Sequence, residues 1–167
     1  MDFVQGDILD KELIKKHCSD ADIIHHLAGI TDVPRVKSQS NADHDKKIIE
    51  VAQEGTQNIL DVMKDDCKIV MPSTHVVYEG LETVKNDILE NEETAPILSY
   101  GKSKDYNEKQ LKESGKNYII LRLGSVYGYS TDTARIDIMA NYFSKVASQN
   151  GILKLFAGGR QIKSLVP

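Results

Sequence analysis

A tyrosine and a lysine lie four residues apart in the stretch Tyr100-Gly101-Lys102-Ser103-Lys104. We expect a helix here, and the spacing then puts Tyr100 and Lys104 on one helix face. A tyrosine hydroxyl titrates near ~10 when unperturbed, which is too high for efficient proton transfer at neutral pH. An ammonium group beside it favours the phenolate and lowers that pKa. The pair is a candidate acid or base, although the same spacing also arises by chance on exposed helices.

Other polar or small residues follow expected strands, at the carboxyl ends where parallel sheets bind ligands. Ser73 and Thr74 end an apolar stretch, and their hydroxyls can donate hydrogen bonds to a substrate oxygen or simply form a turn. Asp7 can accept bonds from a nucleotide, or it can be an ordinary turn residue. Ala28 and Gly29 would let a ligand approach the backbone, or they would permit close packing.

The histidines and cysteines do not indicate a metal site or a disulfide. His25 and His26 are adjacent in an expected strand, so their side chains point to opposite faces. No set of Cys, Asp or Glu residues has zinc-like spacing near them. Cys18 and Cys67 show no CxxC pattern, which indicates two reduced thiols.

The elements that must position these residues alternate between strand and helix, because the apolar periodicity switches repeatedly. Ile- and Val-rich strands separated by helices indicate a parallel sheet with crossover connections. The pattern therefore predicts an α/β doubly wound parallel sheet. We expect strands at 3–6, 21–28, 67–71, 118–123 and 152–156, helices at 11–18, 43–64, 99–114 and 135–149, and loops at 32–40 and 80–98.

Composition narrows the class of protein. The chain has 167 residues, with 21 Lys and Arg against 25 Asp and Glu, for a formal charge of −4. This balance argues against binding of nucleic acid, which needs a basic face. No apolar run approaches ~18 residues, and no secretory signal opens the sequence, so we expect a cytoplasmic protein without a membrane span.

Seven short motifs gain specificity from their order. Together they resemble the extended short-chain dehydrogenase/reductase family, in particular the NAD-dependent nucleotide-sugar epimerases and dehydratases. The resemblance runs through the whole chain. The motifs are Gly6-Asp7-Ile8, His26-Leu27-Ala28-Gly29, Glu54-Gly55-Thr56, Ser73-Thr74-His75-Val76-Val77-Tyr78, Tyr100-Gly101-Lys102-Ser103-Lys104, Leu121-Arg122-Leu123-Gly124-Ser125-Val126-Tyr127-Gly128 and Gly158-Gly159-Arg160-Gln161.

The resemblance implies a Rossmann-like fold, NAD as cofactor (NADP not excluded), a nucleotide-sugar substrate and reversible hydride transfer at a sugar carbon. By this likeness Tyr100 would exchange the hydroxyl proton, Lys104 would lower its pKa and bond the nicotinamide ribose, and Thr74 would orient the sugar hydroxyl. Lys163 stands where the family usually has an arginine for the substrate diphosphate, so the charge is kept and the bidentate fork is lost. The other implied cofactor contacts are Asp7, Ile8, Leu27, Ala28, Gly29 and Ser73, and the remaining implied substrate contact is Ser125.

Four departures from the family pattern qualify these expectations. The glycine fingerprint G-x-x-G-x-x-G is absent, and Ala52 and Ser125 replace residues that are usually Asn. The chain also stops at Pro167, where the family continues into a substrate lobe. We therefore expect a fragment whose sheet lacks the first strands and helix and which is inactive alone. Residues 1–128 would be the remainder of the dinucleotide-binding domain, and 129–167 would begin the substrate lobe.

The resemblance also bears on the reaction and on assembly. The 4,6-dehydratases carry an Asp-Glu pair where His75 and Val76 stand, so an epimerase is favoured over a dehydratase. Two alternatives stay open, namely a non-catalytic binding or regulatory protein and a nicotinamide-dependent reductase of a small carbonyl compound. The family forms dimers through helices that correspond to 43–64 and 99–114, so we expect a homodimer of the complete protein.

Overall fold

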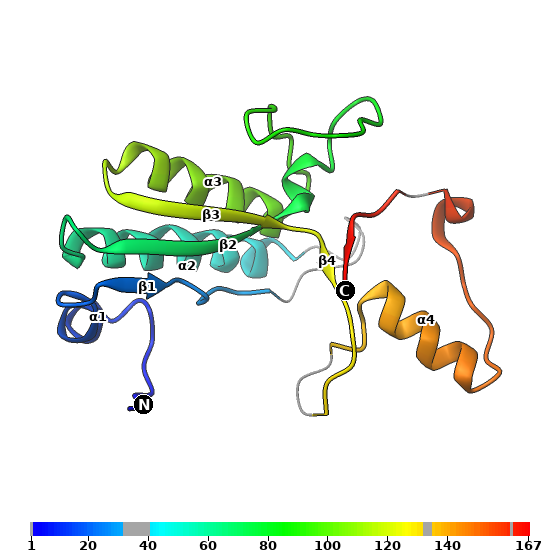
Figure 1. Cartoon of the computed structure of the whole chain (residues 1–167), viewed down its shortest axis with the longest axis horizontal. Coiled ribbons are helices and arrows are strands. Elements are labelled where there is room, and N and C mark those ends of the chain that lie inside the picture. The colour runs from blue at the N-terminus through cyan, green and yellow to red at the C-terminus, as the bar shows by residue number, and fades with distance from the viewer. Residues whose placement is uncertain (1, 32–40, 132–134, 161) are drawn as a thin grey trace. The chain divides into compact units, whose positions relative to one another are not determined.

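The computed structural model describes residues 2–31, 41–131, 135–160 and 162–167. It has an α/β fold with parallel strands and an incomplete Rossmann-like sheet, as the sequence predicts. The chain forms two compact units, Met1–Arg122 (unit 1) and Leu123–Pro167 (unit 2) (Figure 1). None of the helices in the described ranges is both long and apolar enough to cross a membrane. The predicted functional division at residue 128 stays a prediction.

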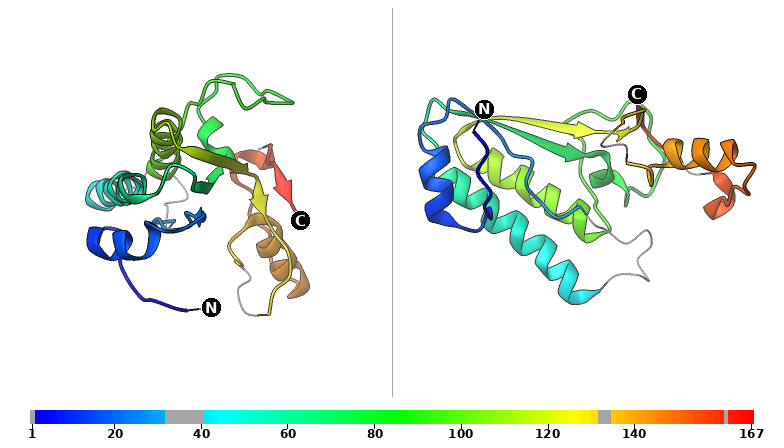
Figure 2. Two further views of the ribbon diagram at one scale, coloured as in Figure 1. Left: turned by 60° about the vertical axis from the view of Figure 1, so that its left-hand side comes forward. Right: turned by 90° about the horizontal axis from the view of Figure 1, so that it is seen from below.

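Unit 1 is a parallel sheet with helices packed on one face. The strands lie in the order β1-β2-β3, and Ile24 of β1 is opposite Ile69 of β2. Figure 2 shows α2 and α3 side by side on the same face of this sheet. The elements are α1 (Lys11–Cys18), β1 (Ile23–His25), α2 (Ala42–Val62), β2 (Lys68–Thr74), the 3₁₀ helix η2 (His75–Tyr78), α3 (Ser99–Glu113) and β3 (Asn117–Leu123).

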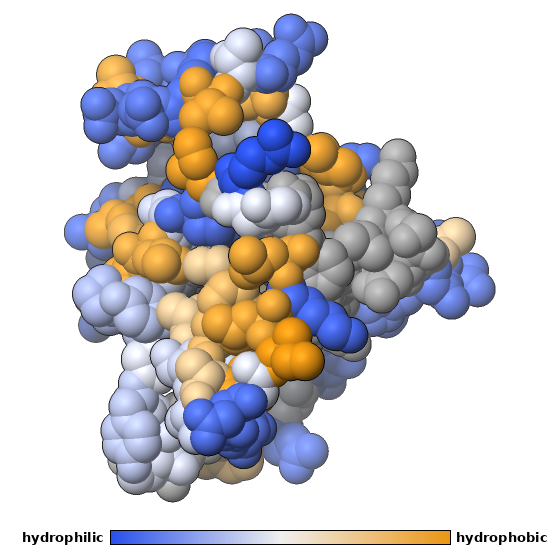
Figure 3. Space-filling view, turned by 90° about the vertical axis from the view of Figure 1, so that its right-hand side faces the viewer, coloured by the Kyte–Doolittle hydropathy of each residue, from blue (hydrophilic) through white to orange (hydrophobic). Residues whose placement is uncertain are grey.

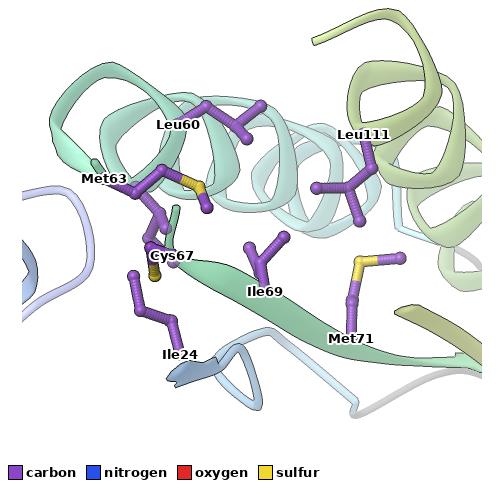
Figure 4. Close-up of a cluster of buried hydrophobic side chains, with 8 residues drawn as sticks. Ile24, Leu60, Met63, Cys67, Ile69, Met71 and Leu111 are labelled. Atoms are coloured by element: carbon purple, nitrogen blue, oxygen red, sulfur yellow. The ribbon is translucent and has the colours of Figure 1, made fainter. Parts of the chain in front are cut away.

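The core of unit 1 lies between the sheet and the two long helices (Figure 4). Ile69 and Met71 point from β2 toward Leu60 of α2 and Leu111 of α3. Burying such a side chain contributes about 1.5–3 kcal/mol, so this cluster fixes how the helices sit on the strands. On the opposite face β3 leaves apolar side chains partly exposed, for example Leu121 at 42%.

Local signals in the sequence set the helix ends. The Asp10 carboxylate accepts the backbone N–H of Leu13 at 3.1 Å and starts α1, as its position predicts. Gly115 follows α3 with φ of +68°, a left-handed conformation in which glycine avoids the steric cost of a Cβ atom. The expected helix over 11–18 is confirmed, and those over 43–64 and 99–114 are confirmed to within two residues.

Unit 2 is small and has little packing. Its two short strands pair in parallel, with Ser125 opposite Leu165 and Val126 opposite Val166. None of its residues at 123–131, 135–155, 158–160 and 162–167 is buried. Its elements are β4 (Ser125–Val126), α4 (Met139–Ser148), the 3₁₀ helix η3 (Phe156–Gly159) and β5 (Leu165–Val166).

Two strand predictions are wrong because a strand needs a neighbour. Residues 3–6 and 152–156 carry strand-like apolar runs, yet the first forms no element and the second none before η3 begins at Phe156. No described strand runs beside either run to complete a hydrogen-bonded ladder. In unit 2 the strand that pairs with β4 is instead β5.

Other boundaries also differ from expectation. Pro72 does not end β2, which continues to Thr74. Pairing with β1 ends where His26 donates its N–H to the carbonyl of Val70, so the missing N–H of Pro72 faces no partner strand. β1 itself covers only Ile23–His25 of the expected 21–28.

The helix expected over 135–149 begins late, at Met139. The side-chain amide of Asn141 donates to the carbonyl of Arg135 at 3.0 Å, so the preceding residues form a turn. The expected loop over 32–40 lies outside the described residues, and the loop over 80–98 is confirmed as a segment without strand or long helix.

Candidate functional site

Tyr100 and Lys104 lie in the first two turns of α3, as predicted. A Cβ atom on Gly101 would lie 3.3 Å from the carbonyl oxygen of Val76, so this end of α3 packs tightly against η2. Lys104 is half-buried, and burial lowers the pKa of its ammonium group. Proximity to this cation favours the phenolate form of a tyrosine.

Ser73 and Thr74 are buried at the carboxyl end of β2. The Thr74 hydroxyl oxygen accepts the backbone N–H of Val76 at 3.3 Å and so caps η2. Both β2 and η2 contact α3. Unit 1 therefore brings the Thr74 turn against the helix end that carries Tyr100 and Lys104.

His26 is a buried histidine for which the sequence predicted no role, although it opens one of the seven motifs. Its Nε2 atom lies 2.9 Å from the hydroxyl oxygen of Thr56, which also accepts from the Asn107 amide at 2.7 Å. Burial, and then the charge of Lys104, lower the pKa of His26 to about 4, so the ring is neutral at pH 7. Its buried Nδ1 atom has no hydrogen-bond partner among the described residues.

A buried ion pair is a second feature for which the sequence predicted no role. Glu108 of α3 is 1% exposed, and Arg122 of β3 donates to it from Nη2 at 2.6 Å. Burial alone raises the pKa of Glu108, but bonds from Arg122 and Ser73 and nearby positive charge outweigh it, so the pKa is lowered. Both residues belong to elements predicted from the sequence, but neither was among the expected site residues.

Asp7 and Ile8, which the resemblance implies as cofactor contacts, both have hydrogen-bond partners within the protein. The Asp7 carboxylate accepts the backbone N–H of Leu9 at 2.9 Å, which closes a turn before α1. The carbonyl of Ile8 accepts from the Asn58 amide at 3.0 Å, and its side chain touches α2 at Gly55. Ile8 is thus fixed by packing, while Asp7 is exposed.

The small residues after β1 form an open chain segment. Leu27, Ala28 and Gly29 are exposed, and a Cβ atom placed on Gly29 would meet nothing within 4 Å. This leaves room for a ligand beside the backbone, in line with the expectation for these positions. No cluster of three or more potential metal-ligating side chains occurs within the described ranges.

Ser125 and Lys163 come together inside unit 2. Ser125 donates its N–H to the carbonyl of Ser164 at 2.8 Å, next to Lys163, whose side chain is exposed. A Cβ atom on Gly124 would lie 2.9 Å from the same carbonyl, so glycine permits this close approach. The backbone of Ser125 is therefore bonded to Ser164, the residue that follows Lys163.

Known proteins share this fold. The structure of UDP-glucuronic acid 4-epimerase from Bacillus cereus, in complex with UDP-glucuronic acid and NAD, matches with a TM-score of 0.76 at 24% identity, covering 98% of this chain and 51% of that one. UDP-glucose 4-epimerase from Thermotoga maritima, with UDP-glucose, gives 0.75 at 21% identity, with 98% and 54% coverage. A dTDP-glucose 4,6-dehydratase from Streptomyces venezuelae gives 0.76 at 23%, with 98% and 50% coverage.

Sequence comparison agrees with the fold. A probable low-salt glycan biosynthesis reductase from Haloferax volcanii is 29% identical over 157 residues, which are 91% of this chain and 49% of the relative. The chain therefore spans about half the length of this curated relative. Residues 1–166 match the NAD dependent epimerase/dehydratase family. The motifs, the parallel α/β fold and this match agree, and the chain belongs to the NAD-dependent epimerase/dehydratase family.

Proposed function

We propose that this chain is part of an enzyme that transfers a hydride between a sugar carbon of a nucleotide sugar and NAD, and that the net reaction is an epimerisation. The observation that carries the proposal is the packing of the Thr74 turn against the start of α3, which bears Tyr100 and Lys104. A hydroxyl, a phenol and an ammonium group then occupy one part of unit 1. Removal of a proton from a sugar hydroxyl needs such a set.

The residues present fit the nicotinamide end of the cofactor. Lys104 is a half-buried cation whose charged form is disfavoured by burial, so a ribose hydroxyl oxygen would be a suitable partner. The orphaned Nδ1 atom of His26 offers a further polar group, and the open backbone at Gly29 leaves steric room three residues later in the chain. NAD, when bound, would accept a hydride and return it. The choice between NAD and NADP stays open.

The chain's own residues would then handle the proton and the orientation of the sugar. Tyr100, whose phenolate form the Lys104 ammonium would favour, would take the proton of the reacting hydroxyl and give it back. Thr74 would donate a hydrogen bond from its hydroxyl to the same sugar oxygen and hold it near Tyr100. Asp7, Ile8, Leu27, Ala28, Gly29 and Ser73 are proposed as further cofactor contacts.

Ser125 and Lys163 are proposed to hold the nucleotide diphosphate part of the substrate. Lys163 supplies a positive charge to the phosphates, and Ser125 supplies a hydroxyl on the neighbouring strand. Because a lysine lacks the planar fork of an arginine, we expect one phosphate contact where a guanidinium would make two.

Two observations bear on the type of reaction. His75 and Val76 directly follow Thr74, and neither is a carboxylic acid that could eliminate water. This supports epimerisation over 4,6-dehydration, although proteins of both kinds share the fold. The second candidate is a nicotinamide-dependent reductase, favoured by the name of the Haloferax volcanii relative.

Assembly and cofactor capture are also part of the proposal. α2 and α3 present an outer surface on which Tyr106 is 42% exposed, and we propose that this surface pairs two copies of the complete protein. Light scattering of that protein should give twice the chain mass. We expect the 167 residues alone to bind NAD weakly or not at all, because they carry no G-x-x-G-x-x-G motif. Isothermal titration that found micromolar affinity would contradict this.

The decisive experiment uses the protein expressed from its whole gene. UDP-glucose and UDP-glucuronic acid are incubated with it and NAD, and the sugars recovered are separated by chromatography. Appearance of the C4 epimer without loss of water supports the proposal. Accumulation of a 4-keto-6-deoxy sugar would identify a dehydratase, and net consumption of added NADH by a carbonyl substrate would identify a reductase.

A further inference from the structure

Glu108 and Arg122 connect three elements of unit 1 that the proposed reaction requires. Glu108 lies four residues after Lys104 and eight after Tyr100 on α3, so the three side chains lie along one side of the helix. Arg122 reaches the Glu108 carboxylate from β3, with Nε at 3.0 Å and Nη2 at 2.6 Å. This two-nitrogen contact fixes the orientation of both groups.

The same carboxylate holds the segment that contains Thr74. The Ser73 hydroxyl donates to Oε1 of Glu108 at 2.6 Å, and Ser73 directly precedes Thr74. Arg122 donates from Nη1 to the hydroxyl of Tyr78, at the other end of η2. Its guanidinium carbon also lies 5.1 Å from the centre of the Tyr78 ring. Both ends of the segment 73–78 are therefore attached to one ion pair.

Arg122 and α3 also hold the loop that follows η2. Nη1 of Arg122 donates to the carbonyl of Glu90 at 3.0 Å. The Thr94 hydroxyl donates to Asp105 of α3 at 2.5 Å. The loop in turn pairs with η2, since the N–H of Ala95 donates to the carbonyl of Val77 at 2.7 Å. The loop beside the Thr74 segment is thus tied to the same ion pair and to α3.

We propose that Glu108 and Arg122 are a positioning pair that holds the segment 73–78, and with it the Thr74 hydroxyl, at a fixed place relative to Tyr100 on α3. The inference rests on the proposed function and adds two residues that touch neither substrate nor cofactor. A buried ion pair often contributes little net stability, because desolvation offsets the attraction. Placement of the segment gives this pair a role that an apolar pair would not fill.

The test compares Glu108→Gln and Arg122→Lys with the matched control Lys112→Ala in the protein expressed from its whole gene. Gln keeps the shape of Glu108 but loses its charge, and Lys keeps the charge of Arg122 but lacks the planar fork that contacts Glu108 through two nitrogens and Tyr78 through a third. Lys112 contacts the same carboxylate at 3.3 Å from an exposed position. Its removal changes the charge around Glu108 without releasing the segment 73–78.

Two readouts separate positioning from general stability. The first is hydrogen exchange of the backbone amides of Val76, Glu79 and Ala95, compared with amides in the middle of α2. We expect about tenfold faster exchange in the first group for Glu108→Gln, with α2 unchanged. The second is turnover of UDP-glucuronic acid and UDP-glucose. We expect kcat to fall about 10²-fold with KM nearly constant, because the reacting groups are misplaced by a fraction of an ångström.

Each outcome decides the inference. Wild-type exchange and wild-type kcat in both variants would overturn it, as would faster exchange that extends equally through α2, since the pair would then be structural only. The inference would also be overturned if Lys112→Ala changed amide exchange and kcat as much as Glu108→Gln and Arg122→Lys do. If the wild-type protein converts neither sugar nucleotide, the proposed function fails, while local exchange in 73–78 still decides whether the pair positions this segment.

Discussion

The two units hold their site residues in different ways. In unit 1, Thr74 lies on β2, and Tyr100 and Lys104 lie on α3. Both elements pack around buried side chains such as Ile69, which is 0% exposed. In unit 2 none of the residues whose burial is described is buried, and Tyr129 and Ile152 are 91% and 86% exposed. Figure 3 shows hydrophobic residues at the surface of the face that it draws, among hydrophilic ones.

This difference in packing predicts that proton transfer depends on unit 1 and that binding of the substrate phosphates depends on unit 2. Proton transfer needs groups held within a fraction of an ångström, and only a packed core supplies that precision. Contacts to phosphate tolerate more movement, because charge attraction falls off gradually with distance. We therefore expect large effects on kcat from unit 1 and smaller effects on KM from Ser125 and Lys163 in unit 2.

The largest effect should come from removing the proposed acid or base. Tyr100→Phe should lower kcat of the complete protein by about 10²- to 10⁴-fold and leave NAD binding unchanged, because only the transferred proton is lost. Turnover and isothermal titration measure the two effects. The control is Tyr118→Phe on β3, at a partly exposed position outside the proposed site and the proposed dimer surface, which should keep full turnover. Unchanged kcat in Tyr100→Phe would refute the catalytic assignment.

The next effect tests the difference in packing directly. Ile69→Ala removes a fully buried side chain of β2 and should lower the free energy of unfolding by about 2–5 kcal/mol. Ile152→Ala changes an isoleucine that is 86% exposed and should change it by less than about 0.5 kcal/mol. Urea denaturation followed by circular dichroism gives both values. Equal losses in the two variants would mean that Ile152 is packed in solution as firmly as Ile69.

A pH effect should follow from the neutral His26. The pKa of His26 is about 4 in the folded protein and 6.5 in a model peptide. Between these two values, the histidine is protonated in the unfolded chain and neutral in the folded one. The contribution is complete above pH 6.5 and is lost as the pH falls toward 4. Between pH 6.5 and about pH 5 the free energy of unfolding should fall by about 1.5 kcal/mol, at ~1.4 kcal/mol per unit of pKa, because the unfolded histidine is already half protonated at pH 6.5.

The comparison for this effect is His26→Gln, which keeps a polar group toward Thr56 but cannot titrate. The variant is expected to be less stable at pH 7, because the amide fits the space of the ring imperfectly. Between pH 6.5 and pH 5 its stability should fall less steeply than that of the wild type. Parallel slopes for the two proteins would show that His26 does not carry the effect.

The smallest effect is expected in unit 2. Lys163→Ala should raise KM for a UDP-sugar by several-fold and leave kcat nearly unchanged, because an exposed cation contributes a modest, screened attraction. Lys163→Arg should restore or improve KM, since the fork can contact two phosphate oxygens. Steady-state kinetics at two salt concentrations measure both. A loss of kcat in Lys163→Ala would show that unit 2 also takes part in proton transfer, and would contradict the division between the two units.

Much of unit 1 is predictable from sequence because its signals are local. Asp10 before an amphipathic run marks the start of α1, and Gly115 marks the end of α3. Pairing between strands is not local, so the run at 152–156 resembles a strand and is none, while Pro72 lies inside one. His26 and Glu108 escape prediction as site residues because their side-chain partners, Thr56 and Ser73, are 30 and 35 positions away.

The sequence by itself determined the fold class, the family and the residue types that could move a proton, since periodicity, caps and motif order are properties of neighbouring residues. The four-residue spacing alone puts Tyr100 and Lys104 on one helix face. Only the tertiary structure decided what surrounds them. The neutral state of His26, the burial of Lys104 and the attachment of the Thr74 segment to Glu108 arise from contacts between distant segments. Such contacts form only when the β-strands and helices pack and exclude water from the groups between them.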